Sequence, residues 1–186
     1  MATGNDRAQG KPASGFLSRG FRPFFLGAAC LAAMAVPLWA LALSGAIALP
    51  GDFASPAWHV HEMIFGYTGA VLAGFSLTAV PNWTGRLPVA GRPLGALFAL
   101  WLIGRAAMLA APGIGPVAAG VIDALFPLVL AGYLLREIIA AGNMRNLPIA
   151  GLFTLFALAN VFWHVAGVVG WDSDLAQRLG LAVVTV

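Results

Sequence analysis

The chain has 186 residues, of which only 9% are charged and 60% are hydrophobic, and its mean hydropathy is +0.88. Because an ordinary soluble domain is about 25% charged, this composition excludes a soluble globular protein and indicates an integral membrane protein. The single cysteine excludes an internal disulfide, and the chain has no CxxC or CxxCH motif for a zinc knuckle or a c-type haem. The formal net charge of +3 comes mostly from loop Lys and Arg, so it reports topology and gives no reason to expect a nucleic-acid partner.

In chain order, residues 1–23 are rich in Gly, Ser, Lys and Arg and are predicted to form a mobile cytoplasmic arm. Five apolar runs follow, each close to the roughly 20 residues that a helix needs to cross a bilayer. They cover residues 24–44, 62–80, 94–112, 117–135 and 148–169. Residues 175–186 are apolar but only about half the length of a span, and we interpret them as a truncated sixth helix. The predicted fold is an all-α, polytopic transmembrane helix bundle, with residues 24–186 as the N-terminal half of a larger bundle.

The basic residues predict the orientation of these spans. Eight Lys and Arg side chains lie before the first run, between the second and third runs, or between the fourth and fifth runs. The alternate connections hold only one. The positive-inside rule therefore places residues 1–23, 81–93 and 136–147 in the cytoplasm, and residues 45–61 and 170–174 outside.

Two charged residues lie at matching depths in neighbouring spans. Arg105 is about seven residues, or roughly 10 Å, from the outer end of its run, and Asp123 is about six residues, or roughly 9 Å, from the outer end of the next. They are predicted to pair, because charges inside a membrane are usually paired. The pair is either purely structural, or it holds a propionate or another anion, or it forms part of a proton path.

The histidines are expected at the same outer depth. His164 lies about five residues from the outer end of its run, with Asn160 one turn deeper on the same face; His61 and Glu62 open the second run. Because residues two apart on a helix differ by about 200° in direction, His59 and His61 cannot both face one site if both are helical. His61 is the better candidate ligand, and His59 is its rival or a plain loop residue. His164 is a ligand or a core histidine, and Glu62 supports a ligand or caps a helix.

Four stretches resemble the NnrS family: residues 21–29 (FRPFFLGAA), 58–86 (WHVHEMIFGYTGAVLAGFSLTAVPNWTGR), 100–105 (LWLIGR) and 162–167 (FWHVAG). The resemblance implies a multi-pass bacterial inner-membrane protein linked to nitric oxide, nitrosative stress and denitrification, which contains haem and copper. Family members have about twice as many spans as the five found here. The resemblance supplies no ligand assignment for either cofactor, so the ligand predictions rest on the depth argument.

Neutral imidazole suits both metals, but two or three histidines can hold a haem axially and would leave copper with too few ligands unless further helices add some. We therefore predict b-type haem as the first cofactor and copper as the second. The predicted axial ligands of the haem are His61 and His164. The residues predicted to bind the cofactor are His61, His164, His59, Glu62, Arg105 and Asn160.

These features lead to two functional hypotheses. In the first, the protein binds haem and handles nitric oxide, as an enzyme, a sensor or a scavenger. In the second, it is a proton- or ion-linked transporter whose intramembrane charges line a path. The expected partners are the lipid bilayer, nitric oxide or a related small molecule, and a missing C-terminal half or an oligomeric partner.

Overall fold

The computed structural model describes residues 15–47 and 56–185, and every regular element within these ranges is a helix. Five segments are long and apolar enough to cross a membrane: α1 (Phe21–Leu43), Pro56–Thr84, α4 (Arg92–Ile114), α5 (Pro116–Ala140) and Met144–Val169. The predicted all-α polytopic bundle is therefore confirmed. Residues 1–14 of the predicted arm, the connection 48–55 and residue 186 lie outside the described residues.

The second span is longer than the apolar pattern predicted, and it is not uniform. It consists of α2 (Pro56–His61), the π-helical segment η3 (Glu62–Thr68) and α3 (Gly69–Thr84). The predicted run began at residue 62 because the polar side chains before it interrupt the apolar pattern, although the helix continues through them. Consequently His59 and His61 both lie on a helix and point in different directions.

The remaining elements are short pieces around the spans. The 3₁₀ turns are η1 (Phe16–Ser18), before α1, and η4 (Met144–Asn146), which leads into α6 (Leu147–Val169). The tail forms α7 (Asp174–Thr185), which packs on α6 and on the π-helical segment. A Cβ atom added at Gly180 of α7 would lie 2.7 Å from Ile64 Cγ2, so only a glycine allows this close approach.

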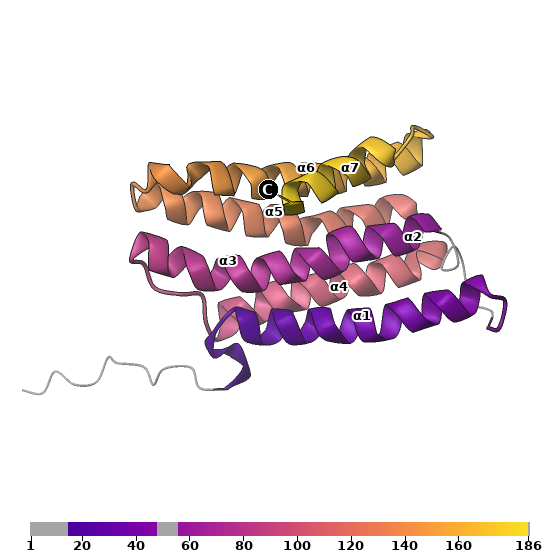
Figure 1. The fold of residues 1–186 in the computed structure, drawn as a ribbon, viewed down its shortest axis with the longest axis horizontal. Coiled ribbons are helices and arrows are strands. Elements are labelled where there is room, and N and C mark those ends of the chain that lie inside the picture. The colour runs from indigo at the N-terminus through magenta and orange to yellow at the C-terminus, as the bar shows by residue number, and fades with distance from the viewer. Residues whose placement is uncertain (1–14, 48–55, 186) are drawn as a thin grey trace, which may run out of the picture.

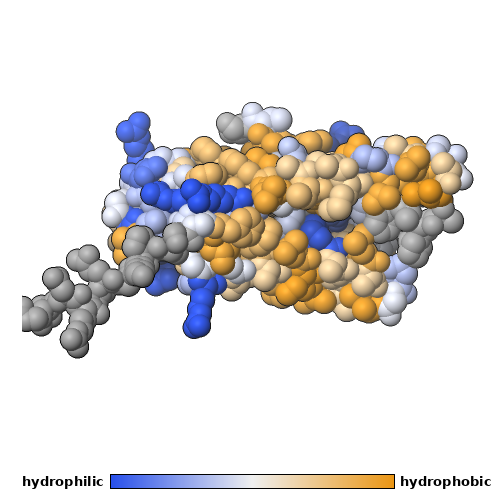
Figure 2. All heavy atoms as spheres, turned by 90° about the horizontal axis from the view of Figure 1, so that it is seen from below, coloured by the Kyte–Doolittle hydropathy of each residue, from blue (hydrophilic) through white to orange (hydrophobic). Residues whose placement is uncertain are grey.

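The spans lie side by side along the long axis, with α1 on one side of the bundle and α6 with α7 on the other (Figure 1). Contacts join α1 to α3, α4 to α5 and α5 to α6, and α3 also contacts α5. The surface in Figure 2 is mostly hydrophobic along the helices, and most hydrophilic side chains gather at one end. This distribution is that of a protein surrounded by lipid.

Small residues let the second span approach its neighbours. Ala70 is fully buried, and a Cβ atom at Gly74 would lie 2.6 Å from the ring of Phe25 in α1. Within a bilayer, where lipid tails are as apolar as leucine, close backbone approach of this kind is a main source of helix association. Gly66, one turn before Ala70, faces Arg105 of α4 instead.

Candidate functional site

The π-helical segment shapes one wall of a buried polar cluster. A π turn inserts an extra residue into a helix, and such bulges are frequent at functional sites. Here the Thr68 hydroxyl donates to the Met63 carbonyl at 2.9 Å, and the Trp101 indole N–H donates to the Gly66 carbonyl at 3.0 Å. A Cβ atom at Gly66 would lie 2.5 Å from Arg105 Nη1 and 2.9 Å from Glu62 Oε2, so the glycine makes room for an ion pair.

Arg105 joins two carboxylates from different spans. Its Nη1 donates to both oxygens of Glu62 at 2.7 Å, and its Nη2 donates to Asp123 Oδ1. The three residues are buried, with exposed fractions of 8% or less. Arg105 and Asp123 are thus in contact as predicted, but the sequence did not reveal that Glu62 shares the same guanidinium.

His61 lies at the centre of the cluster and is fully buried. Its Nδ1 is 3.2 Å from Glu62 Oε1, and its Nε2 is 3.3 Å from both Asp123 Oδ2 and Asn160 Nδ2. Since Asn160 Nδ2 can only donate, this arrangement fits the neutral tautomer in which Nδ1–H donates to Glu62 and Nε2 keeps its lone pair. A carboxylate that holds the other ring nitrogen is the usual support of a metal-binding histidine.

His164 approaches the same carboxylate oxygen from α6. Its Nε2 is 2.9 Å from Asp123 Oδ2, which also accepts a hydrogen bond from Asn160 Nδ2 at 2.9 Å. The ring lies against Gly120 of α5, where a Cβ atom would be 2.9 Å away. Gly120 precedes Asp123 by about one helical turn and therefore shares its face. This spacing is the sequence signal that could have identified Gly120 as part of the site.

One edge of His164 opens toward lipid. A groove of about 380 Å³ lies between α5 and α6, and its lining is apolar except for His164. The His164 side chain is 12% exposed, whereas those of His61 and Asp123 are fully buried. His164 is therefore the member of the cluster that a molecule in the bilayer could reach first.

His59 does not belong to the cluster. Its ring stacks on Trp39 of α1, with ring centroids 4.0 Å apart and an interplanar angle of 15°. His61, in contrast, faces Trp163 at 4.2 Å and His164 at 5.1 Å between ring centroids. The two histidines thus point to different neighbours, as their spacing on a helix requires.

The cluster carries an excess negative charge. Arg105 contributes one positive charge, and Glu62 and Asp123 contribute two negative charges, so the sum is −1 when both imidazoles are neutral. An uncompensated charge inside a membrane is costly, by about 2.5–3.5 kcal/mol on insertion scales. A bound cation or an added proton would remove this excess.

Comparison with known proteins supplies the family. A family described as NnrS protein matches residues 15–186 of this chain. The chain belongs to the NnrS family. No curated protein and no solved structure matches it.

The cofactors that the NnrS resemblance implies can be tested against this geometry. Asp123 Oδ2 contacts both His61 and His164, so the carboxylate fills the space between the rings where an iron and its porphyrin would lie. Arg105 and Asn160, predicted to bind the cofactor, are instead hydrogen-bonded to carboxylates of the cluster. These residues do not fit a haem held between the two histidines.

The same three residues form a group that could hold a single metal ion. His61, Asp123 and His164 each offer one donor atom, and the three atoms lie within 4.8 Å of one another. Two donors about 2.0 Å from one ion at a tetrahedral angle are about 3.3 Å apart, close to the 3.3 Å and 2.9 Å found from Asp123 Oδ2 to the two imidazoles. Two imidazole nitrogens and one carboxylate oxygen are ligands that several transition metals accept, copper(II) among them, and copper is one of the two cofactors that the resemblance implies.

Proposed function

We propose that this NnrS-family chain is a copper protein of the bacterial inner membrane that acts on or responds to nitric oxide. The observation that carries the proposal is the convergence of His61 Nε2, His164 Nε2 and Asp123 Oδ2 in a buried cluster with excess negative charge. Family membership supports the link to nitric oxide. Copper bound there would supply a one-electron couple and a coordination position for a small ligand.

The surrounding residues prepare the donor atoms. Glu62 holds Nδ1 of His61 and so directs Nε2 toward the centre. Arg105 binds Asp123 Oδ1, so the metal would be held by Oδ2, which accepts a hydrogen bond from Asn160 Nδ2 and faces His164 Nε2. Asn160 Oδ1 is buried and has no hydrogen-bond partner among residues 15–47 and 56–185. Its Nδ2 donates to Asp123 Oδ2 and so helps to hold that carboxylate in place.

Access to the centre is expected from the membrane. Nitric oxide is small and uncharged, so it enters the apolar groove between α5 and α6 without losing hydrogen bonds. The groove contacts His164 and is otherwise lined by side chains such as Val121, Leu125, Val161 and Val165. His164 is therefore the ligand nearest to the incoming molecule.

Copper binding tests the proposal. The full chain, purified in detergent and loaded with copper(II), should hold one tightly bound ion per chain. His61→Ala and His164→Ala should each weaken the copper affinity by at least about tenfold, as loss of a ligand or its support typically does. His59→Ala is the matched control and should bind as the wild type does. Full copper binding by both His61→Ala and His164→Ala would refute the proposed centre.

The transporter hypothesis has one observation in its favour. The excess charge at Asp123 can be neutralised by a proton instead of a metal, and intramembrane acids and histidines often relay protons. In that case copper-free protein in vesicles should dissipate a proton gradient, and Asp123→Asn should abolish the flux. No flux from copper-free wild-type vesicles would exclude this alternative.

A further inference from the structure

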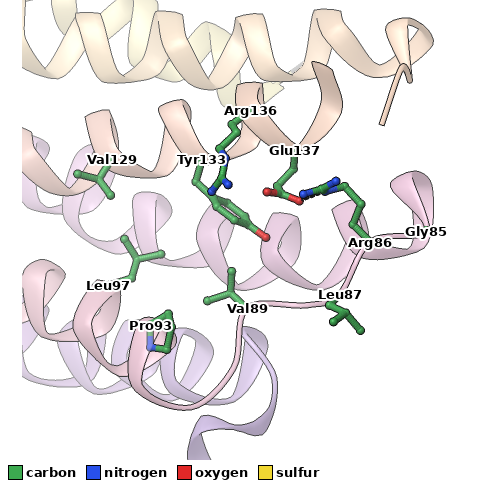
Figure 3. A pocket seen from close by; sticks show the side chains of 10 residues that line it. All are labelled: Gly85, Arg86, Leu87, Val89, Pro93, Leu97, Val129, Tyr133, Arg136 and Glu137. Carbon is green, nitrogen blue, oxygen red and sulfur yellow. Dashed lines mark hydrogen bonds and ion pairs between the residues drawn. The ribbon is translucent and has the colours of Figure 1, made fainter. Parts of the chain in front are cut away.

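A second site lies at the opposite end of the bundle. A pocket of about 700 Å³ opens between the connection that follows α3 and the last turns of α5, at the end predicted to face the cytoplasm. Its volume is within the about 300–1,000 Å³ typical of ligand pockets. The residues that line it are Gly85, Arg86, Leu87, Val89, Pro93, Leu97, Val129, Tyr133, Arg136 and Glu137 (Figure 3).

The polar side chains of this pocket gather at one end of it. Arg86 Nε donates to Glu137 Oε2, which leaves that carboxylate neutralised. Arg136 forms no ion pair with any acidic side chain in the part of the chain that the structure describes. Figure 3 shows Arg136 beside Tyr133, whose hydroxyl turns toward the pocket. The two arginines and one glutamate give this end a net charge of +1.

The other end of the pocket is apolar. Leu97 of α4 and Val129 of α5 lie one or more turns deeper in the membrane than Arg136, and Pro93 and Val89 complete the wall. Val129 is 49% exposed, so this part opens directly to lipid. A ligand that fits must therefore carry a negative charge at the membrane surface and an apolar chain that runs along α4 and α5.

From this juxtaposition we propose that the pocket binds an anionic phospholipid, with the phosphodiester against Arg136 and Tyr133 and an acyl chain against Leu97 and Val129. A headgroup with one net negative charge matches the net charge of the pocket, whereas a zwitterionic headgroup such as that of phosphatidylcholine does not. Basic pockets between transmembrane helices on the cytoplasmic side commonly bind such headgroups. An arginine that only extended to the surface for solvation would need neither the cavity nor the tyrosine hydroxyl.

Thermal unfolding of the full chain in neutral detergent tests this site, with phosphatidylglycerol, phosphatidylcholine or inorganic phosphate added. Phosphatidylglycerol should raise the unfolding midpoint, whereas the other two should leave it unchanged. Arg136→Gln should raise the half-saturating lipid concentration about fivefold, the factor that corresponds to about 1 kcal/mol for one arginine near anionic lipid. Arg145→Gln removes the same charge from the same end, outside the pocket, and should have no effect.

A cavity-filling variant gives an independent result. Val129→Trp keeps every charge but fills the apolar part, and it should weaken the response to phosphatidylglycerol; Leu102→Trp, at a residue of similar exposure on α4, is its control. An equal response to phosphatidylcholine, or equal losses in Arg136→Gln and Arg145→Gln, would overturn the proposal. An equal response to inorganic phosphate would show a site for a free anion and would also overturn it.

Discussion

Replacing Arg105 should have a far larger effect on stability than replacing Asp123, although the two are in contact. Arg105→Gln leaves Glu62 and Asp123 as two buried carboxylates without a cation, and the charge of the cluster becomes −2. Asp123→Asn leaves the pair of Arg105 with Glu62 intact, and the charge becomes 0. The sign of the excess charge therefore predicts which of the two partners the fold can lose.

The magnitudes follow from what each change leaves behind. Removal of one partner from a buried ion pair costs about 3–5 kcal/mol, and Arg105→Gln removes the partner of two carboxylates, so we expect the upper part of this range. Asp123→Asn keeps the shape of the side chain and weakens its charge-assisted hydrogen bonds, at a cost of about 1–3 kcal/mol. The double variant restores the wild-type charge of −1, so it should recover part of the loss, with a coupling of about 0.5–3 kcal/mol.

The assay is reversible unfolding of the full chain in mixed micelles, titrated with a denaturing detergent. The three variants are compared with the wild type, and Arg145→Gln, an exposed arginine outside the cluster, is the control. If the losses of Arg105→Gln and Asp123→Asn add without coupling, or if Asp123→Asn is the more damaging change, the charge count of the cluster is wrong.

Three further predictions follow from the packing and the orientation. Gly66→Ala should destabilise the chain by at least about 1–3 kcal/mol in the same unfolding assay, because its methyl group would displace a buried ion pair. Gly120→Ala should shift the adjacent imidazole and weaken copper affinity in a binding titration, whereas Gly132→Ala, with open space around its Cβ position, should not. Cysteines placed at Ala90 and Ser173, in a chain whose native cysteine is replaced, should react with an impermeant thiol reagent from opposite sides of the membrane; labelling of both from one side would refute the orientation.

The common depth of the site could be predicted from the sequence, because helix length and the positive-inside rule fix how far each residue lies from the surface. Arg105, Asp123 and His164 were placed at one depth in this way, and the structure brings them together. Depth does not determine which spans are neighbours or which way a helix faces. For this reason Asp123 was expected only as a partner of Arg105, although it lies between both histidines.

Other features depend on local geometry that no periodicity encodes. The π turn from Glu62 to Thr68 shifts the faces of the residues that follow it, although Glu62 and Gly66, four residues apart, share a face as ideal helical spacing predicts. The absence of a side chain at Gly66 leaves room for the contact of Glu62 with Arg105. The choice of His61 over His59 could be argued from spacing, but the stacking of His59 on Trp39 required the structure.

Electron paramagnetic resonance of the copper(II)-loaded full chain tests the proposed centre most directly. Coordination by His61 Nε2 and His164 Nε2 predicts nitrogen superhyperfine structure from two imidazoles, which falls to one in either histidine variant and is unchanged in His59→Ala. A spectrum with no imidazole nitrogen, or one that neither His61→Ala nor His164→Ala alters, would contradict the account.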